Sequence, residues 1–196
     1  MGHDEVERLT VGNLTVSIVY DTDPAESPRE WENVGKMVCW HRRYNLGDEQ
    51  PSCQPSEFFA RLMQERECEK HRKFVPDELP DTHVARYIDK HFYVLPLNLY
   101  DHSGISISTG RFSCPWDSGQ VGWIYMSKER AEKEGIADPL EYLRCEVSTY
   151  DEYLTGQVYG FVITDADRDT VDSCWGFYGL GYCKEAARDA AESVAR

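Results

Sequence analysis

Residues 100–126 constrain the fold most, because they combine strand-forming side chains with almost no charge. Between residues 101 and 126 only Asp101, Arg111 and Asp117 are formally charged. A solvent-exposed linker of this length normally carries many more charged side chains, since it has no packed surface to support it. We therefore expect this stretch to form two strands around a turn that contains the phrase FSCPWDSG, and to pack or line a pocket.

The whole chain has the size and composition of one globular domain. It contains 196 residues, of which 41% are hydrophobic and 12% aromatic. This is enough apolar material to form a core without disulfide bonds or metal. Short strand patterns and short helix patterns are mixed along the sequence, with no repeat and no long linker. The prediction is a single α+β domain over residues 1–196, with a mainly antiparallel sheet packed against a few helices.

Apolar and polar residues alternate in several short segments, as is typical of strands. The first of these, residues 9–20, ends in a cluster of turn-forming residues and is expected to be one strand. The last two are expected to form a hairpin whose tip contains the phrase DADRD. The strands predicted after the first cover residues 92–100, 105–110, 120–127, 158–164 and 173–179.

Helices are indicated by apolar spacing and by capping residues. The clearest covers residues 56–74, with Ser56 as its expected N-cap. Another is expected to have Asp138 as its N-cap and Pro139 at its first position. Further helices are predicted over residues 82–91, 127–135 and 184–196.

The charge distribution limits the classes of partner. The formal net charge is −14, with eight acids against two bases in residues 1–35 and fifteen against eight in residues 127–196. Proteins that bind nucleic acid directly gain affinity from Lys and Arg, so direct nucleic-acid binding is not expected. The longest apolar run is far below the roughly 20 residues that span a bilayer. Seven irregularly spaced cysteines favour a reducing compartment, and we expect a cytoplasmic protein with no membrane partner.

One group of residues could carry chemistry. Asp101 and His102 lie in the phrase DHSG, and Cys114 and Asp117 lie in SCPWDSG. A Cys nucleophile needs a base within hydrogen-bond reach, and His41 or His102 could serve. No established nucleophile motif is matched. The alternative is a turn in which Asp and Ser side chains satisfy backbone donors while Trp116 packs.

A second group mixes cations with aromatic rings. The phrase CWHRRYNLGD contains Trp40, Arg42, Arg43 and Tyr44. With Trp116 they form a candidate site for a phosphate, a base or a carboxylate, because guanidinium groups fork around anions and stack on rings. The alternative is that these arginines pair with some of the 35 acidic residues of the chain.

Metal ligands are suggested only weakly. Cys68 and His71 lie three residues apart on an expected helix, near Cys53, but a second ligand pair is missing. Asp165, Asp167 and Asp169 match the first half of a calcium loop, whereas the required Gly and Glu do not follow. No metal and no cofactor are expected.

Four phrases together resemble an uncharacterised family of bacteriophage, prophage and plasmid accessory proteins: CWHRRYNLGD, YDHSG, FSCPWDSGQVG and CWGFYG. The resemblance implies a mobile-element context and no reaction. With the acidic charge, it favours a protein that binds and inhibits a host nucleic-acid-acting complex through that complex's basic surface. Two alternatives stay open: a hydrolase or transferase that uses the Cys, His and Asp residues of 101–118, and a small-molecule-binding module with an aromatic pocket.

Overall fold

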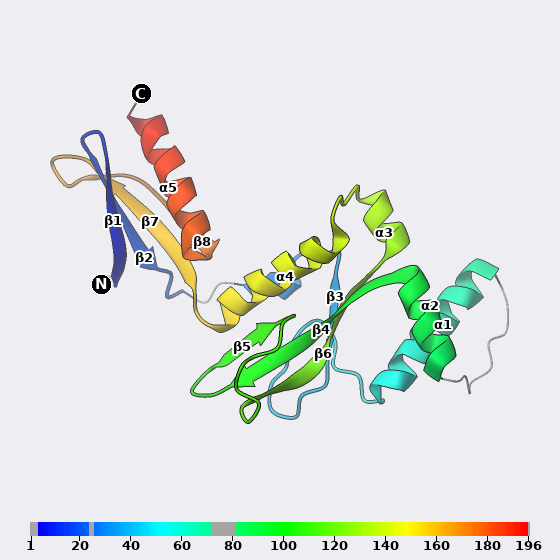
Figure 1. Ribbon diagram of the computed structural model, residues 1–196. Coiled ribbons are helices and arrows are strands. Elements are labelled where there is room, and N and C mark those ends of the chain that lie inside the picture. Colours follow the sequence, from blue (N-terminus) through cyan, green and yellow to red (C-terminus); the bar gives the residue numbers. More distant parts are fainter. Residues whose placement is uncertain (1–3, 24–25, 72–80, 196) are drawn as a thin grey trace. The chain divides into compact units, whose positions relative to one another are not determined.

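The computed structural model describes residues 4–23, 26–71 and 81–195, without the side chains of 67–71 and 81. Within these ranges the chain forms five α-helices and eight strands, and the strands build two antiparallel sheets (Figure 1). The expected α+β class is confirmed.

The chain divides into two compact units, each with one sheet. The terminal unit consists of Met1–Pro28, Gly104–Ser106 and Ser148–Arg196, and the central unit of Arg29–Ser103 and Ile107–Val147. The expectation that residues 1–196 behave as one domain stays a prediction.

The terminal unit is a sheet with one helix packed against it. Its strand order is β1-β2-β7-β8, and α5 lies along the sheet (Figure 1). The elements are β1 (Glu5–Val11), β2 (Leu14–Tyr20), β7 (Val158–Thr164), β8 (Thr170–Tyr178) and α5 (Leu180–Val194). The predicted hairpin of β7 and β8 is confirmed.

Small side chains on α5 let that helix approach the sheet closely. Cys183, Ala187 and Ala191 recur every four residues and are fully buried, so they form one stripe along the helix. Val16 and Ile18 of β2 belong to the same buried cluster, together with residues of β7. The inward-facing apolar side chains of the strands and the buried stripe of α5 therefore pack together in one core.

The prediction of a single strand over residues 9–20 is wrong, because these residues contain a turn. β1 and β2 form a hairpin in which Val11 pairs with Leu14. The two residues between them begin with Gly12, whose φ of +62° suits a tight hairpin turn. The alternation continues on both sides of this turn, which is why the pattern looked continuous.

The second sheet has the order β3-β6-β4-β5, and its residues belong to the central unit except for the first half of β5. Its strands are β3 (Lys36–Cys39), β4 (Phe92–Asp101), β5 (Ile105–Ser108) and β6 (Ser118–Ser127). The strands predicted on either side of the FSCPWDSG turn exist, but they do not pair with each other. β6 pairs with β4 instead, so residues 109–117 return to the Asp101 end of β4. There the Asp101 amide donates a hydrogen bond to the Asp117 carbonyl at 2.8 Å.

Several helices precede or follow the strands of the central sheet. The 3-10 helix η1 (Pro28–Glu30) precedes β3, and α1 (Pro55–His71) and α2 (Asp81–His91) precede β4. α3 (Lys128–Lys133) follows β6, and α4 (Pro139–Leu154) contains the boundary between the units. Phe58 and Leu62 of α1 pack against a buried cluster that includes Tyr125 of β6.

Of the two predicted helix N-caps, Asp138 of α4 is confirmed and Ser56 of α1 is not. The Asp138 carboxylate accepts a hydrogen bond from the Glu141 amide at 3.0 Å, as expected for the N-cap of α4. The prediction that Ser56 caps α1 is wrong. That helix begins at Pro55, and the Phe58 amide donates to the Gln54 carbonyl at 3.0 Å. Proline suits a first helical position because its missing N–H has no intrahelical partner there.

Candidate functional site

One end of the central sheet collects most of the predicted site residues. β3 and β4 both run antiparallel to β6, so both strands end on the side of the sheet where β6 begins. Seven side chains lie at this end of the strands, and we call them the strand-end cluster. They are His41, Arg43, Tyr44, Asp101, His102, Cys114 and Asp117.

Asp101 organises the first half of the strand-end cluster. Its carboxylate accepts a hydrogen bond from the Tyr44 hydroxyl at 3.1 Å and pairs with the Arg43 guanidinium. The charge of Asp101 raises the pKa of Arg43. The His41 ring stacks on Tyr44 with 5.0 Å between ring centroids, and its Nδ1 accepts the Arg43 and Tyr44 amides at 3.3 and 3.2 Å. His41 is therefore engaged in shaping its own turn.

Asp117 organises the second half. Its Oδ2 lies 3.5 Å from Sγ of Cys114 and 3.4 Å from Nδ1 of His102. The His102 and Asp117 side chains are 63% and 38% exposed, so this arrangement faces solvent. The Ser118 hydroxyl donates to the Cys114 carbonyl at 2.5 Å and fixes the turn.

The order of these groups differs from that of an activated nucleophile. Such a site places the base between the nucleophile and the acid, whereas here the carboxylate lies between the thiol and the imidazole. Three cavities of about 520, 390 and 260 Å³ in the central unit are lined by residues outside the strand-end cluster. Cys114, His102 and Asp117 therefore come together on an open surface, whereas His41 contacts Arg43 and Tyr44.

The remaining predicted ligand-binding residues differ in how deeply they are buried. Trp40 packs edge-to-face on Phe58 and Trp123, and its Nε1 donates to the Cys53 carbonyl at 2.6 Å. Trp116 is 92% exposed. Arg42 is exposed as well. Trp40 therefore belongs to the packing of the fold, while Trp116 and Arg42 are available on the surface.

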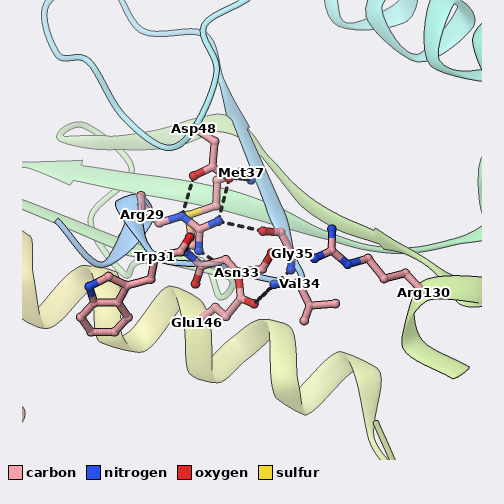
Figure 2. A network of polar contacts seen from close by, with 9 residues as sticks. All are labelled: Arg29, Trp31, Asn33, Val34, Gly35, Met37, Asp48, Arg130 and Glu146. Carbon is pink, nitrogen blue, oxygen red and sulfur yellow. Dashed lines mark hydrogen bonds and ion pairs between the residues drawn. The ribbon is translucent and has the colours of Figure 1, made fainter. Parts of the chain in front are cut away.

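A second polar arrangement, which the sequence did not indicate, lies buried in the same unit (Figure 2). Arg29 binds both oxygens of Asp48 at 2.8 and 2.7 Å, Oε2 of Glu146 at 2.9 Å and the Gly35 carbonyl at 2.8 Å. The other carboxylate atoms are used too: Oε1 of Glu146 accepts the amides of residues 34 and 35, and Asp48 accepts the Met37 amide. We call this set the Arg29 network.

The Arg29 network fixes the start of the sheet rather than a ligand. The Arg29 side chain is 4% exposed, and burial alone would favour its neutral form. Its hydrogen bonds to Asp48 and Glu146 outweigh burial and raise its pKa. Cys39 lies buried nearby, where burial, followed by the charge of Asp48, raises the pKa of its thiol to about 12. Cys39 is therefore no candidate nucleophile.

Neither metal hypothesis gains support. The Asp165 carboxylate accepts the amides of Asp167 and Asp169 at 2.9 and 3.0 Å, so it closes its own hairpin tip. In the described part of the chain no group of three or more His, Cys, Asp or Glu side chains could hold a metal ion. The side chains of Cys68 and His71 lie outside the described residues.

No helix among residues 4–23, 26–71 and 81–195 is both long and apolar enough to cross a membrane. Comparisons with protein-family models, with curated proteins and with solved structures find no significant match to this chain.

Proposed function

We propose that this chain is a protein-binding protein whose contact surface is the loop of residues 109–117 together with the strand-end cluster. The proposed partner is a host protein with a basic nucleic-acid-binding surface, which the chain occupies and inhibits in an anti-defence role. The mobile-element resemblance of the sequence supports this context.

The observation that carries the proposal is the 92% exposure of Trp116. Tryptophan is among the side chains that dominate protein interfaces, because it buries a large apolar area at little cost in conformational entropy. The backbone around it is fixed: Asp117 is held to Asp101 by a backbone hydrogen bond, and Ser118 is bonded to Cys114. A fixed loop loses less entropy on binding than a mobile one.

Charge supports the choice of partner. The net charge of −14 favours association with a surface rich in Lys and Arg, and it repels nucleic acid itself. Asp117 directly follows Trp116 in the chain and adds a carboxylate to the same loop. A ring next to a carboxylate resembles a base next to a phosphate, which is the chemistry that a nucleic-acid-binding surface recognises.

Capture from nuclease-treated host extract tests the proposal. Wild-type protein and Tyr182→Ala should retain the same partner, since Tyr182 is an exposed aromatic residue of the terminal unit, at 65%. Trp116→Ala should weaken retention by about 30-fold, as for an interface hot spot. Double-stranded DNA or RNA should release the partner in competition. Equal retention by Trp116→Ala, or a partner that nucleic acid does not displace, would refute the proposal.

The enzymatic alternative keeps one observation in its favour, which is the contact of both Cys114 and His102 with Asp117. A conservative variant can separate the two functions. Cys114→Ser replaces the thiol by a hydroxyl of similar size, so it should leave partner capture within about twofold of the wild type if the chain acts by binding. Loss of the biological effect with intact capture would instead assign the effect to chemistry at Cys114.

A further inference from the structure

The smallest of the three cavities described above is lined by basic side chains from three different elements. These are Lys36 of β3, Arg66 of α1 and Arg130 of α3. Leu62 and Phe92 add apolar surface to the lining. The volume is about 260 Å³, just below the usual range for drug-sized ligands. A ligand of this cavity is therefore small and meets several cations at once.

Arg66 is held in place at this cavity by contacts within the fold. Its side chain is only 16% exposed, and its guanidinium lies over the Phe92 ring, 5.2 Å from the ring centroid. One terminal nitrogen donates a hydrogen bond to Glu129 at 3.0 Å. A guanidinium has five N–H donors, so this bond leaves others for a ligand. Because the side chain is already ordered, it loses little conformational entropy on binding.

Arg130 and Lys36 use little of their donor capacity within the fold. The Arg130 amide donates to the Ser127 hydroxyl at 3.1 Å, which fixes the backbone of this residue. Its guanidinium makes one long hydrogen bond in the described part of the chain, to the Asn33 carbonyl at 3.4 Å. Neither Arg130 nor Lys36 makes an ion pair with a side chain that the structure describes. Both cations are therefore available to an anion in the cavity.

The charge of this cavity is opposite to that of the chain. The lining contains three basic side chains and one carboxylate, that of Glu65. When Glu129, the partner of Arg66, is counted as well, three cations still face two carboxylates. The whole chain, by contrast, carries 35 acidic and 21 basic residues. Since a cavity lined mainly by one sign of charge concentrates ions of the other sign, this cavity favours an anion that the rest of the protein repels.

We infer that this cavity binds a small anion that carries a phosphate group. A phosphate monoester has three terminal oxygens and up to two negative charges, which match cations on three elements, whereas one guanidinium can satisfy a carboxylate. Leu62 and Phe92 would contact an apolar group attached to the phosphate, where its surface leaves water. This inference does not depend on the proposed function.

Calorimetric titration of the whole protein with inorganic phosphate, in chloride buffer of constant ionic strength, tests the inference. We expect saturable binding of phosphate by the wild type and no measurable binding of acetate. Arg130→Gln and Lys36→Gln should each weaken phosphate binding by about tenfold, the effect of losing one hydrogen bond between charged groups. Phenyl phosphate separates two sources of the group: tighter binding than inorganic phosphate would assign the site to a phosphate ester, and equal binding to free phosphate.

A control variant is needed because loss of any cation makes an acidic protein repel anions more strongly. Arg111→Gln removes the same charge from an exposed position in the loop before β6, whereas the cavity lies at the end of that strand, beside Tyr125 and Met126. It should leave the dissociation constant within about twofold of the wild type, because exposed charges are screened over distance. Equal weakening by Arg111→Gln and Arg130→Gln, acetate binding as tight as that of phosphate, or absence of saturable phosphate binding would overturn the inference.

Discussion

The Arg29 network and the strand-end cluster both gather cations and carboxylates in the central unit, but they differ in burial. The Arg29 side chain is 4% exposed, whereas that of Arg43 is 66% exposed. In the first, every carboxylate oxygen and much of the guanidinium are bonded within the fold. In the second, the same kinds of group face water.

The difference shows where the chain uses charge for folding and where it leaves charge available for recognition. A buried charge must be paired and hydrogen-bonded, because its hydration has been lost. An exposed pair contributes little to stability, since water competes with both partners. The two arrangements therefore make opposite predictions for substitution.

The largest effect is expected for Arg29→Ala. The substitution leaves the largely buried Glu146 and the partly exposed Asp48 without their cation, and removal of one partner from a buried pair costs about 3–5 kcal/mol. Urea unfolding followed by circular dichroism would measure the loss. Arg43→Ala is the matched control, and it should leave the unfolding midpoint almost unchanged. Similar losses in both variants would contradict the distinction between the two arrangements.

Glu146→Gln should have an intermediate effect. The glutamine carbonyl can still accept the amides of residues 34 and 35, which lie 3.1 and 3.0 Å from Oε1 of Glu146. The substitution removes the charge that faces Arg29, so we expect a loss of about 1–3 kcal/mol, the value of a hydrogen bond to a charged group. The same unfolding experiment measures it. A loss as large as that of Arg29→Ala would mean that Asp48 alone contributes little.

The fold could be predicted from sequence wherever its signals were local. Alternation identified β4 to β8, and Asp138 marked the start of α4. The two-residue turn at Gly12 was missed because the alternation resumes after it. Strand pairing could not be predicted in the same way: the two strands around the FSCPWDSG turn were predicted, but the position of β4 between them in the sheet was not.

The site residues could likewise be predicted only where a local sequence pattern marked them. Residue chemistry selected Asp101, Cys114 and Asp117, which the structure brings to one edge of the sheet. The Arg29 network could not be found in this way, since its side chains lie 19 and 117 residues apart in sequence. Nor could sequence distinguish the packed Trp40 from the exposed Trp116, because the strand order decides which ring reaches solvent.

The smallest effect on stability is expected for Trp116→Ala, although its effect on binding should be the largest. An exposed side chain that packs against little contributes little to folding, and such surface substitutions usually change stability by less than about 0.5 kcal/mol. Unfolding and partner capture should therefore be measured on the same preparation. If Trp116→Ala unfolded at a clearly lower urea concentration, the ring would be part of the core, and weakened capture could no longer be assigned to a lost contact. An unchanged midpoint with weakened capture would separate folding from recognition at this loop.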